Sequence, residues 1–177
     1  DSKIVSGSNH GILSIWDTNT RELLLQWRAD DTAMTSLAIF PDNDKIVSGG
    51  FGNTLKIWDA ETGEEIQRFV VTLRVPVSGV AVLPDGNKIV SSGGDGTGRD
   101  LQIWDAETGE GIHAVAQSHN MRRVTCVAVF PNGNKIVSGG WDDYLRIWDV
   151  SAGTLIRVLY GYRFIRCVAV FPDGNGI

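Results

Sequence analysis

The chain has 177 residues, of which 42% are hydrophobic and 21% are charged, a balance that predicts a packed globular core and argues against a disordered chain. Its formal net charge of −5 argues against a general nucleic-acid binder, because such proteins neutralise phosphates with basic side chains. No apolar run approaches the roughly 20 residues that span a bilayer.

Charged residues and cysteines are distributed unevenly along the chain. Residues 1–119 carry 9 basic and 17 acidic side chains, whereas residues 120–177 carry 7 basic and 4 acidic ones, so the two parts have opposite net charge. Cys126 and Cys167 lie 41 residues apart within two similar apolar runs. We expect both to be buried free thiols rather than a disulfide, which favours a reducing compartment.

In chain order, the pattern of apolar runs predicts a series of repeated four-stranded units. A first unit at residues 1–28 begins in the second strand of its repeat, at residues 3–7. Complete units follow, and the last segment supplies the inner strand of a further or shared blade. These segments are approximately residues 29–71, 72–117, 118–160 and, for the inner strand, 161–177.

The unit at residues 118–160 shows its strands and turns most clearly. Four runs rich in Val, Ile, Thr and aromatic residues have the length of typical strands. They are residues 124–130, 135–139, 144–148 and 154–159. The first two are separated by a Pro-Asn-Gly-Asn turn, in which Pro131 presets φ and Gly133 tolerates a positive φ.

The tripeptide Ile-Trp-Asp ends the third strand of each unit and sets the period of the chain. Its tryptophans are 42, 46 and 44 residues apart, and they are Trp16, Trp58, Trp104 and Trp148. A period of about 40 to 45 residues that is closed by Trp-Asp is typical of a four-stranded propeller blade.

The recurring Pro-Asp-Gly, Lys-Ile-Val-Ser-Gly and Ile-Trp-Asp blocks closely resemble the WD40 repeat family, and the resemblance covers essentially the whole chain. It implies an all-β fold, a WD40-type β-propeller built of four-stranded antiparallel blades, with about four blades in this chain as part of a larger ring. It also implies a platform for protein partners, although fold alone does not establish function.

Two departures from the family pattern concern a hydrogen-bonded tetrad of His, Asp, Ser and Trp that such blades often contain. No Gly-His pair precedes an inner strand in full register, and the Asp position holds Asn9, Phe51 and Trp141 in three units. We therefore expect a broken tetrad. Blade rigidity would then depend on the packing of the four structural tryptophans of the Ile-Trp-Asp motifs.

The chain begins in the second strand of a repeat and ends after an inner strand. Three ring architectures are compatible with this order: a fragment of a longer propeller, a half-ring that dimerises into eight blades, and a compact four-bladed ring. Pairing of the first and last segments in one blade would hide two open sheet edges. The sequence favours the fragment, because the chain stops at residues 175–177, where earlier repeats continue into Lys-Ile-Val-Ser.

The repeats differ most in the turn between the second and third strands, on the face where the family often binds partners. This turn carries Phe51 in one unit and Trp141 in another. Three further residues follow Trp141, and they are Asp142, Asp143 and Tyr144. We expect these five residues to contact a protein partner, because large rings bury much area at interfaces. The alternative is that Trp141 folds down and fills the gap left by the broken tetrad.

A second group of candidates is mostly basic and surrounds the last two inner strands. It consists of Arg122, Arg123, Arg163, Phe164 and Arg166. Arginine and aromatic side chains are enriched at protein interfaces, so we expect them to bind an acidic protein segment, or a phosphate of lipid or nucleic acid. The alternative is a solvated rim whose charges differ between blades.

No nucleophile, base and orienting residue recur in a catalytic arrangement, and the repeated serines occupy equivalent positions, whereas an active site needs one special geometry. We therefore predict no catalytic residue, no cofactor and no metal site. The predicted function is a non-enzymatic protein–protein interaction scaffold within a multiprotein assembly. Two alternatives are a regulatory or sensor propeller of a larger enzyme and a phosphate-binding surface. We expect other proteins rather than nucleic acid as partners, and the strand phase also allows self-association into a larger ring.

Overall fold

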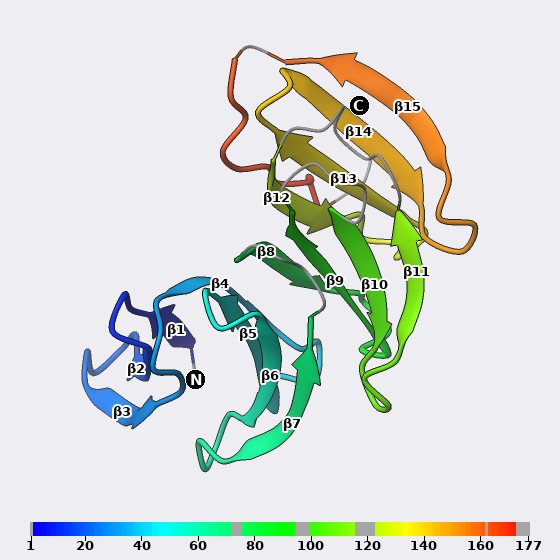
Figure 1. Ribbon diagram of the computed structural model, residues 1–177. Helices are drawn as coiled ribbons and strands as arrows, with labels where there is room; N and C mark the ends of the chain where they lie inside the picture. The colour runs from blue at the N-terminus through cyan, green and yellow to red at the C-terminus, as the bar shows by residue number, and fades with distance from the viewer. Residues whose placement is uncertain (1, 72–75, 95–99, 116–122, 162, 173–177) are drawn as a thin grey trace.

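The computed structural model describes residues 2–71, 76–94, 100–115, 123–161 and 163–172. It contains 15 strands in four antiparallel sheets, and the described residues include no helix long and apolar enough to cross a membrane. The sheets follow one another along an open arc (Figure 1). This arrangement confirms the all-β propeller fold with four-stranded antiparallel blades.

The first sheet has three strands and the other three sheets have four, with each strand paired to its neighbour in the chain. The first contains β1 (Lys3–Gly7), β2 (Ile12–Asp17) and β3 (Leu23–Arg28). The second contains β4 (Met34–Ile39), β5 (Lys45–Gly50), β6 (Thr54–Asp59) and β7 (Glu65–Val70). The third contains β8 (Val77–Val82), β9 (Lys88–Gly93), β10 (Leu101–Asp105) and β11 (Gly111–Val115). The fourth contains β12 (Val124–Val129), β13 (Lys135–Gly140), β14 (Tyr144–Asp149) and β15 (Leu155–Tyr160).

The middle strands of each complete sheet carry the core, because neighbouring strands and neighbouring sheets cover them. In the second sheet, Ile46 and Val47 of β5 and Leu55 and Ile57 of β6 are all buried. Such runs are apolar almost without interruption, as expected for strands that are covered on both faces. The strands predicted for the unit at residues 118–160 are confirmed to within one residue at each end.

A repeated contact joins the inner strands of successive sheets: a side-chain hydroxyl on one strand donates to a main-chain carbonyl at the start of the next. The pairs are Thr35 with Val77, Ser78 with Val124, and Thr125 with Ile165. Because the third pair repeats the first two, residues 165–170 continue the series of inner strands. Within the described part of the chain, however, no strand pairs with them.

Each tryptophan of the Ile-Trp-Asp motifs donates a hydrogen bond to a serine on the adjacent second strand. The pairs Trp16–Ser6, Trp58–Ser48, Trp104–Ser91 and Trp148–Ser138 have Nε1–Oγ distances of 3.0, 2.9, 2.8 and 2.9 Å. The prediction of a broken tetrad did not include these hydrogen bonds. The Trp–Ser half of the tetrad is present, because the strand register brings the indole and the hydroxyl together.

The aspartate of each Trp-Asp pair shapes the turn that follows it. At Asp59, Oδ1 accepts the backbone N–H groups of Glu61 at 2.9 Å and Thr62 at 2.8 Å. The same pair of bonds, to residues two and three positions later, occurs at Asp17, Asp105 and Asp149. Hydrogen bonds from the turn residues lower the pKa of all four carboxyls below the usual range.

The last described segment differs from the sequence-based expectation. Cys126 is buried, but Cys167 is exposed, so the prediction of two buried thiols is wrong for Cys167. The physical reason is that Val168 and Val170 pack against the fourth sheet, while no described strand covers the opposite side of this segment. The described residues form an open arc and not a compact four-bladed ring (Figure 1).

Candidate partner-binding surface

Trp141 lies in the turn that connects β13 and β14 in the fourth sheet. Its backbone N–H donates to the carbonyl of Arg123 at 3.0 Å, and Asp143 has a φ of 68°, in the left-handed region. These two features keep the turn tight. The Trp141 side chain is 46% exposed, so it does not fill a gap in the core, as the alternative interpretation required.

Phe164, from the last described segment, contacts Trp141 edge to face. The ring centroids are 6.1 Å apart, the ring planes are inclined by 79°, and Phe164 is 55% exposed. Oδ1 of Asp143 accepts the N–H of Phe164 at 3.1 Å, and the carbonyl of Asp143 accepts the N–H of Gly161 at 2.7 Å. The turn that contains Trp141 and Asp143 and the segment that contains Phe164 are separate in the sequence, and these contacts bring them together in one surface. We call Trp141, Asp143 and Phe164 the aromatic tip.

The backbone at the aromatic tip is strained. Arg163 and Phe164 have positive φ values of 32° and 52°. Such values are uncommon for residues other than glycine and cost about 1–3 kcal/mol each. The bond to Asp143 and the contact with Trp141 hold this conformation, and strain of this kind is often retained where a chain binds a partner.

Asp142 lies beneath the turn rather than at its surface. It is buried, and its Oδ2 forms an ion pair with Nη1 of Arg146 on β14 at 2.5 Å. The Arg146 guanidinium lies over the ring of Tyr144, 5.4 Å from its centroid, and Tyr144 packs edge to face against the exposed Tyr160. Asp142 is therefore not an exposed contact residue. It holds the turn in place from below.

The basic candidates differ in their surroundings. Arg122 lies outside the described residues. Arg163 and Arg166 are exposed, whereas Arg123 is half-buried and its Nε has no hydrogen-bond partner among the described residues. An unpartnered buried N–H is costly, so this N–H is available to donate a hydrogen bond to a carboxylate or a phosphate.

Phe51 occupies the corresponding turn of the second sheet, between β5 and β6. Its backbone N–H donates to the carbonyl of Ala33 at 3.1 Å, as Trp141 donates to Arg123, and its side chain is 54% exposed. In the described part of the chain no second aromatic ring packs against it. The third sheet lies between this turn and the aromatic tip (Figure 1), so the two do not form one site.

A second ion pair, between buried Lys56 on β6 and the half-buried Asp30 that precedes β4, was not predicted. Lys56 Nζ is 2.8 Å from Asp30 Oδ2 and donates to the carbonyl of Ala29 at 2.7 Å. Burial raises the pKa of Asp30, but hydrogen bonds from Lys56 and Thr32 outweigh this effect and hold the pKa below its usual range. The signal for both pairs is a cation two positions before the tryptophan in an otherwise apolar strand, a position that Lys56 and Arg146 share.

The chemistry of the aromatic tip suits contact rather than catalysis. Its exposed groups are two rings, and its carboxylate is already engaged by a backbone N–H. Across the residues that the structure describes, no group of three or more His, Cys, Asp or Glu side chains is placed to hold a metal ion. The tip can bury an apolar side chain of a partner, with arginines beside it to meet an acidic one.

A sequence model described as WD domain, G-beta repeat, matches the chain at residues 21–59, 67–105 and 112–149. The matches cover more than half of the chain. Each begins in or just before the outer strand of one sheet and ends at the Trp-Asp of the next sheet, so the sequence repeat is staggered by one strand relative to the sheets. Each sequence repeat therefore contributes strands to two neighbouring sheets. No curated protein matches the chain as a relative.

Proposed function

The chain belongs to the WD40 repeat family, and from that premise we propose that it is a non-enzymatic scaffold subunit that enters a multiprotein assembly through the aromatic tip of its fourth sheet. WD40 repeats form propeller-type domains for protein–protein interaction, and the family is generally non-catalytic. The choice of a binding surface and of a kind of partner is argued from the features of the fourth sheet.

The observation that supports this surface most is the exposed pair of Trp141 and Phe164. Two large rings in contact with each other remain about half exposed. A turn that only faces solvent is not stabilised by exposed aromatic rings. Aromatic residues of this kind supply much of the binding energy at protein interfaces. Because the turn is held by Asp143 from one side and by the Asp142–Arg146 ion pair from below, the rings are already positioned before a partner arrives.

The charge of this region indicates the partner. Residues 120–177 carry a net positive charge, and Arg163 and Arg166 are exposed beside the rings. A partner segment with an apolar side chain flanked by acidic ones would satisfy both the rings and the arginines. Phe51 is a candidate for a second, weaker contact on another sheet, because it presents a single ring.

Capture of partners from a lysate of the source cells tests the surface, with the bound proteins quantified by mass spectrometry. We expect Trp141→Ala to reduce capture about tenfold or more, the loss typical of an aromatic interface residue. Phe51→Ala should reduce capture less. Ile66→Ala provides a matched control, since Ile66 on β7 is similarly exposed but lies on an outer strand. Equal capture by the wild type and by Trp141→Ala, with unchanged circular dichroism, would reject the aromatic tip as the binding surface.

A phosphate-binding surface is the second candidate function, because the buried Nε of Arg123 lacks a partner among the described residues. Replacing Arg122, Arg123, Arg163 and Arg166 together with Gln tests it. Binding of anionic vesicles should then fall and lose its dependence on salt. Unchanged vesicle binding by the fourfold variant excludes this candidate.

The sensor alternative concerns a catalytic domain elsewhere in a longer polypeptide. Sequencing of the complete native transcript tests it. An enzymatic domain in the same open reading frame supports a regulatory propeller, whereas a reading frame that contains propeller repeats alone excludes it.

A further inference from the structure

The turn between β12 and β13 contains an Asn-Gly pair, Asn132 and Gly133, that no other described part of the chain repeats. Asn132 is exposed, and Gly133 has a φ of 71°, in the left-handed region. The backbone N–H of Gly133 donates to the carbonyl of Phe130 at 2.8 Å and closes the turn. Because glycine has no Cβ, no side chain shields the backbone nitrogen that follows Asn132.

The side-chain amide of Asn132 is folded back toward this backbone. Its Oδ1 accepts the backbone N–H of Asn134 at 3.1 Å. The hydrogen bond closes a loop of atoms that includes both Cγ of Asn132 and the backbone nitrogen of Gly133. A bond between these two atoms would expel the side-chain nitrogen as ammonia and form a cyclic imide. The turn therefore holds the two reacting atoms on the same side of the chain.

The other asparagines in the described part of the chain are each followed by a residue that carries a side chain. Those residues are His10, Thr20, Asp44, Thr54, Lys88 and Lys135. A side chain on the following residue crowds the attack by its backbone nitrogen, and the branched side chain of threonine does so most. Asn132 thus differs from these asparagines in the residue that follows it.

Equivalent turns in the second and third sheets carry aspartate at the position of Asn132. Oδ1 of Asp42 accepts the backbone N–H of Asp44 at 3.1 Å, and Oδ1 of Asp85 accepts that of Asn87 at 3.0 Å. These bonds match the one that Asn132 makes in the fourth sheet. An aspartate at position 132 would therefore fit the turn and keep its hydrogen bond.

We propose that Asn132 is a site of deamidation in the folded chain. A base in the solvent takes the proton of the Gly133 N–H, and this nitrogen forms a bond to Cγ of Asn132. The C–N bond of the side-chain amide breaks, and ammonia leaves with a proton from water. Water then adds to one carbonyl of the cyclic imide and reopens it as aspartate or isoaspartate. The net reaction consumes only water, and the inference does not rest on the proposed function.

Deamidation adds a negative charge beside the third sheet. A Cβ added to Gly133 would lie 3.3 Å from Cδ of Pro84, so the turn lies against the equivalent turn of that sheet, which exposes Asp85. Opening of the imide to aspartate preserves the turn. Opening to isoaspartate inserts a methylene into the main chain and disturbs the hydrogen bond from Gly133 to Phe130.

That hydrogen bond also limits the rate of deamidation. It must open before the N–H of Gly133 can lose its proton, so the folded chain reacts during local openings of the turn. We therefore expect deamidation in the folded chain to be slower than in the same chain unfolded in urea. The unfolded chain provides the reference for the chemistry without the turn.

The test is incubation of the folded 177-residue chain in a mildly alkaline buffer, followed by tryptic digestion and mass spectrometry. Cleavage after Arg123 and Lys135 places Asn132 in the peptide 124–135. A second Asn-Gly pair in the sequence, at residues 175–176 outside the described part, falls in a separate peptide. We expect Asn132 to convert about tenfold faster than Asn134 of the same peptide, which corresponds to a barrier lower by about 1.4 kcal/mol. Equal rates at the two positions would overturn the proposal.

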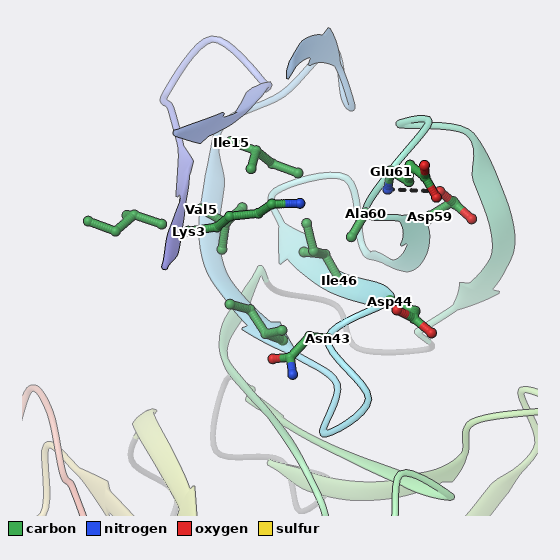
Figure 2. Close-up of a pocket in the computed structure, with 11 residues that line it drawn as sticks. Lys3, Val5, Ile15, Asn43, Asp44, Ile46, Asp59, Ala60 and Glu61 are labelled. Atoms are coloured by element: carbon green, nitrogen blue, oxygen red, sulfur yellow. Dashed lines mark hydrogen bonds between the residues drawn. The ribbon is translucent and has the colours of Figure 1, made fainter. Parts of the chain in front are cut away.

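Two variants of the equivalent turns serve as matched controls, because the backbone N–H that closes each turn donates at 2.9 Å in both. Asp85→Asn places an asparagine before Gly86, whose φ is 73°, and this site should deamidate at a rate similar to that of Asn132. Asp42→Asn places an asparagine before Asn43, which has a side chain at the position of Gly133 (Figure 2). That site should react as slowly as Asn134. Conversion of the Asp42→Asn site as fast as Asn132 would contradict the role assigned to the glycine.

Asn132→Asp supplies the aspartate product directly. On ion exchange it should run from the start with the acidic form that the wild type acquires during incubation. Its melting temperature should equal that of the fresh wild type, because Asp42 and Asp85 occupy the same position in equivalent turns. A clear loss of stability in Asn132→Asp would overturn the claim that the turn accepts the product.

Discussion

β1 and β13 begin with the same five residues, Lys-Ile-Val-Ser-Gly, and yet they end up in different surroundings. Both pair with the next strand in the same register, with Ile4 opposite Trp16 in one sheet and Ile136 opposite Trp148 in the other. Ile136 is fully buried, whereas Ile4 is mostly exposed. The difference arises because β12 covers the inner edge of β13, while no described strand covers β1.

This comparison separates what a repeat determines by itself from what its neighbours supply. The hairpin, the Trp–Ser hydrogen bond and the Asp turn are the same in the first and fourth sheets, because all of their partners lie within one repeat. Burial differs, because it depends on a strand from elsewhere. Variants at matched positions of the two sheets should therefore differ in their effect wherever burial matters, and agree wherever the contact is local.

The largest effect is expected for Arg146→Met in the fourth sheet. This change leaves the carboxylate of Asp142 buried without its cation, which should cost about 3–5 kcal/mol of unfolding free energy in urea. The matched position in the first sheet is Ser14, whose hydroxyl accepts a hydrogen bond from Gln26 at 2.9 Å, and Ser14→Ala should cost about 1 kcal/mol. Adding Asp142→Asn to Arg146→Met should restore part of the loss. Equal losses for Arg146→Met and Ser14→Ala would contradict this account of the ion pair.

The next effect separates the two matched isoleucines. Ile136→Ala should cost about 2–5 kcal/mol, because it leaves a cavity in a packed sheet. Ile4→Ala should cost less than about 0.5 kcal/mol in the 177-residue chain, where the side chain is exposed. Equal losses for Ile4→Ala and Ile136→Ala would contradict the difference in burial between the two sheets.

A smaller difference is expected for the serines that bind tryptophan. Ser138→Ala leaves the buried indole N–H of Trp148 without this acceptor and should cost about 1–3 kcal/mol. Ser6→Ala should cost less than about 0.5 kcal/mol, since Trp16 is exposed and its N–H can donate to water. Chemical denaturation of both variants measures the difference. The prediction fails if the two losses are the same.

The smallest effect should be equal in the two sheets. The pKa values of Asp17 and Asp149 are lowered in the folded chain by bonds from their own turns, so each carboxylate contributes stability above the unfolded value of about 3.9. That contribution is lost as the pH falls through the folded value. Asp17→Asn and Asp149→Asn should each reduce, by the same small amount, the fall in melting temperature between pH 5 and pH 2. A marked difference between the two variants would show that these turns respond to the neighbouring sheets.

Sequence patterns predicted the local features of this molecule well. The strand positions of residues 118–160 follow from apolar runs and turn residues, whose physical causes lie within a few positions of each other. The Trp–Ser bond was not predicted, because the residues at the His and Asp positions of the repeats indicate a broken tetrad. The role of Asp in the Trp-Asp pair was also missed, although it repeats four times.

Contacts between distant segments could not be predicted in the same way. The aromatic tip joins Trp141 to Phe164, and the Lys56–Asp30 pair joins β6 to the segment that precedes β4. Each contact depends on where the arc of sheets places a loop, and the period of the sequence repeat gives no information about that position. The exposure of Cys167 shows the same limit, since its run of residues resembles that of Cys126 but no strand in the described part of the chain covers it.

The most direct test of the central claim is hydrogen exchange of the backbone amides in β1, compared with those in β13. We expect slow exchange in β13, whose inner edge is paired with β12, and faster exchange in β1, which has no inner partner among the described residues. Equal protection of the two strands would contradict the claim that a neighbouring strand, and not the repeat itself, determines burial.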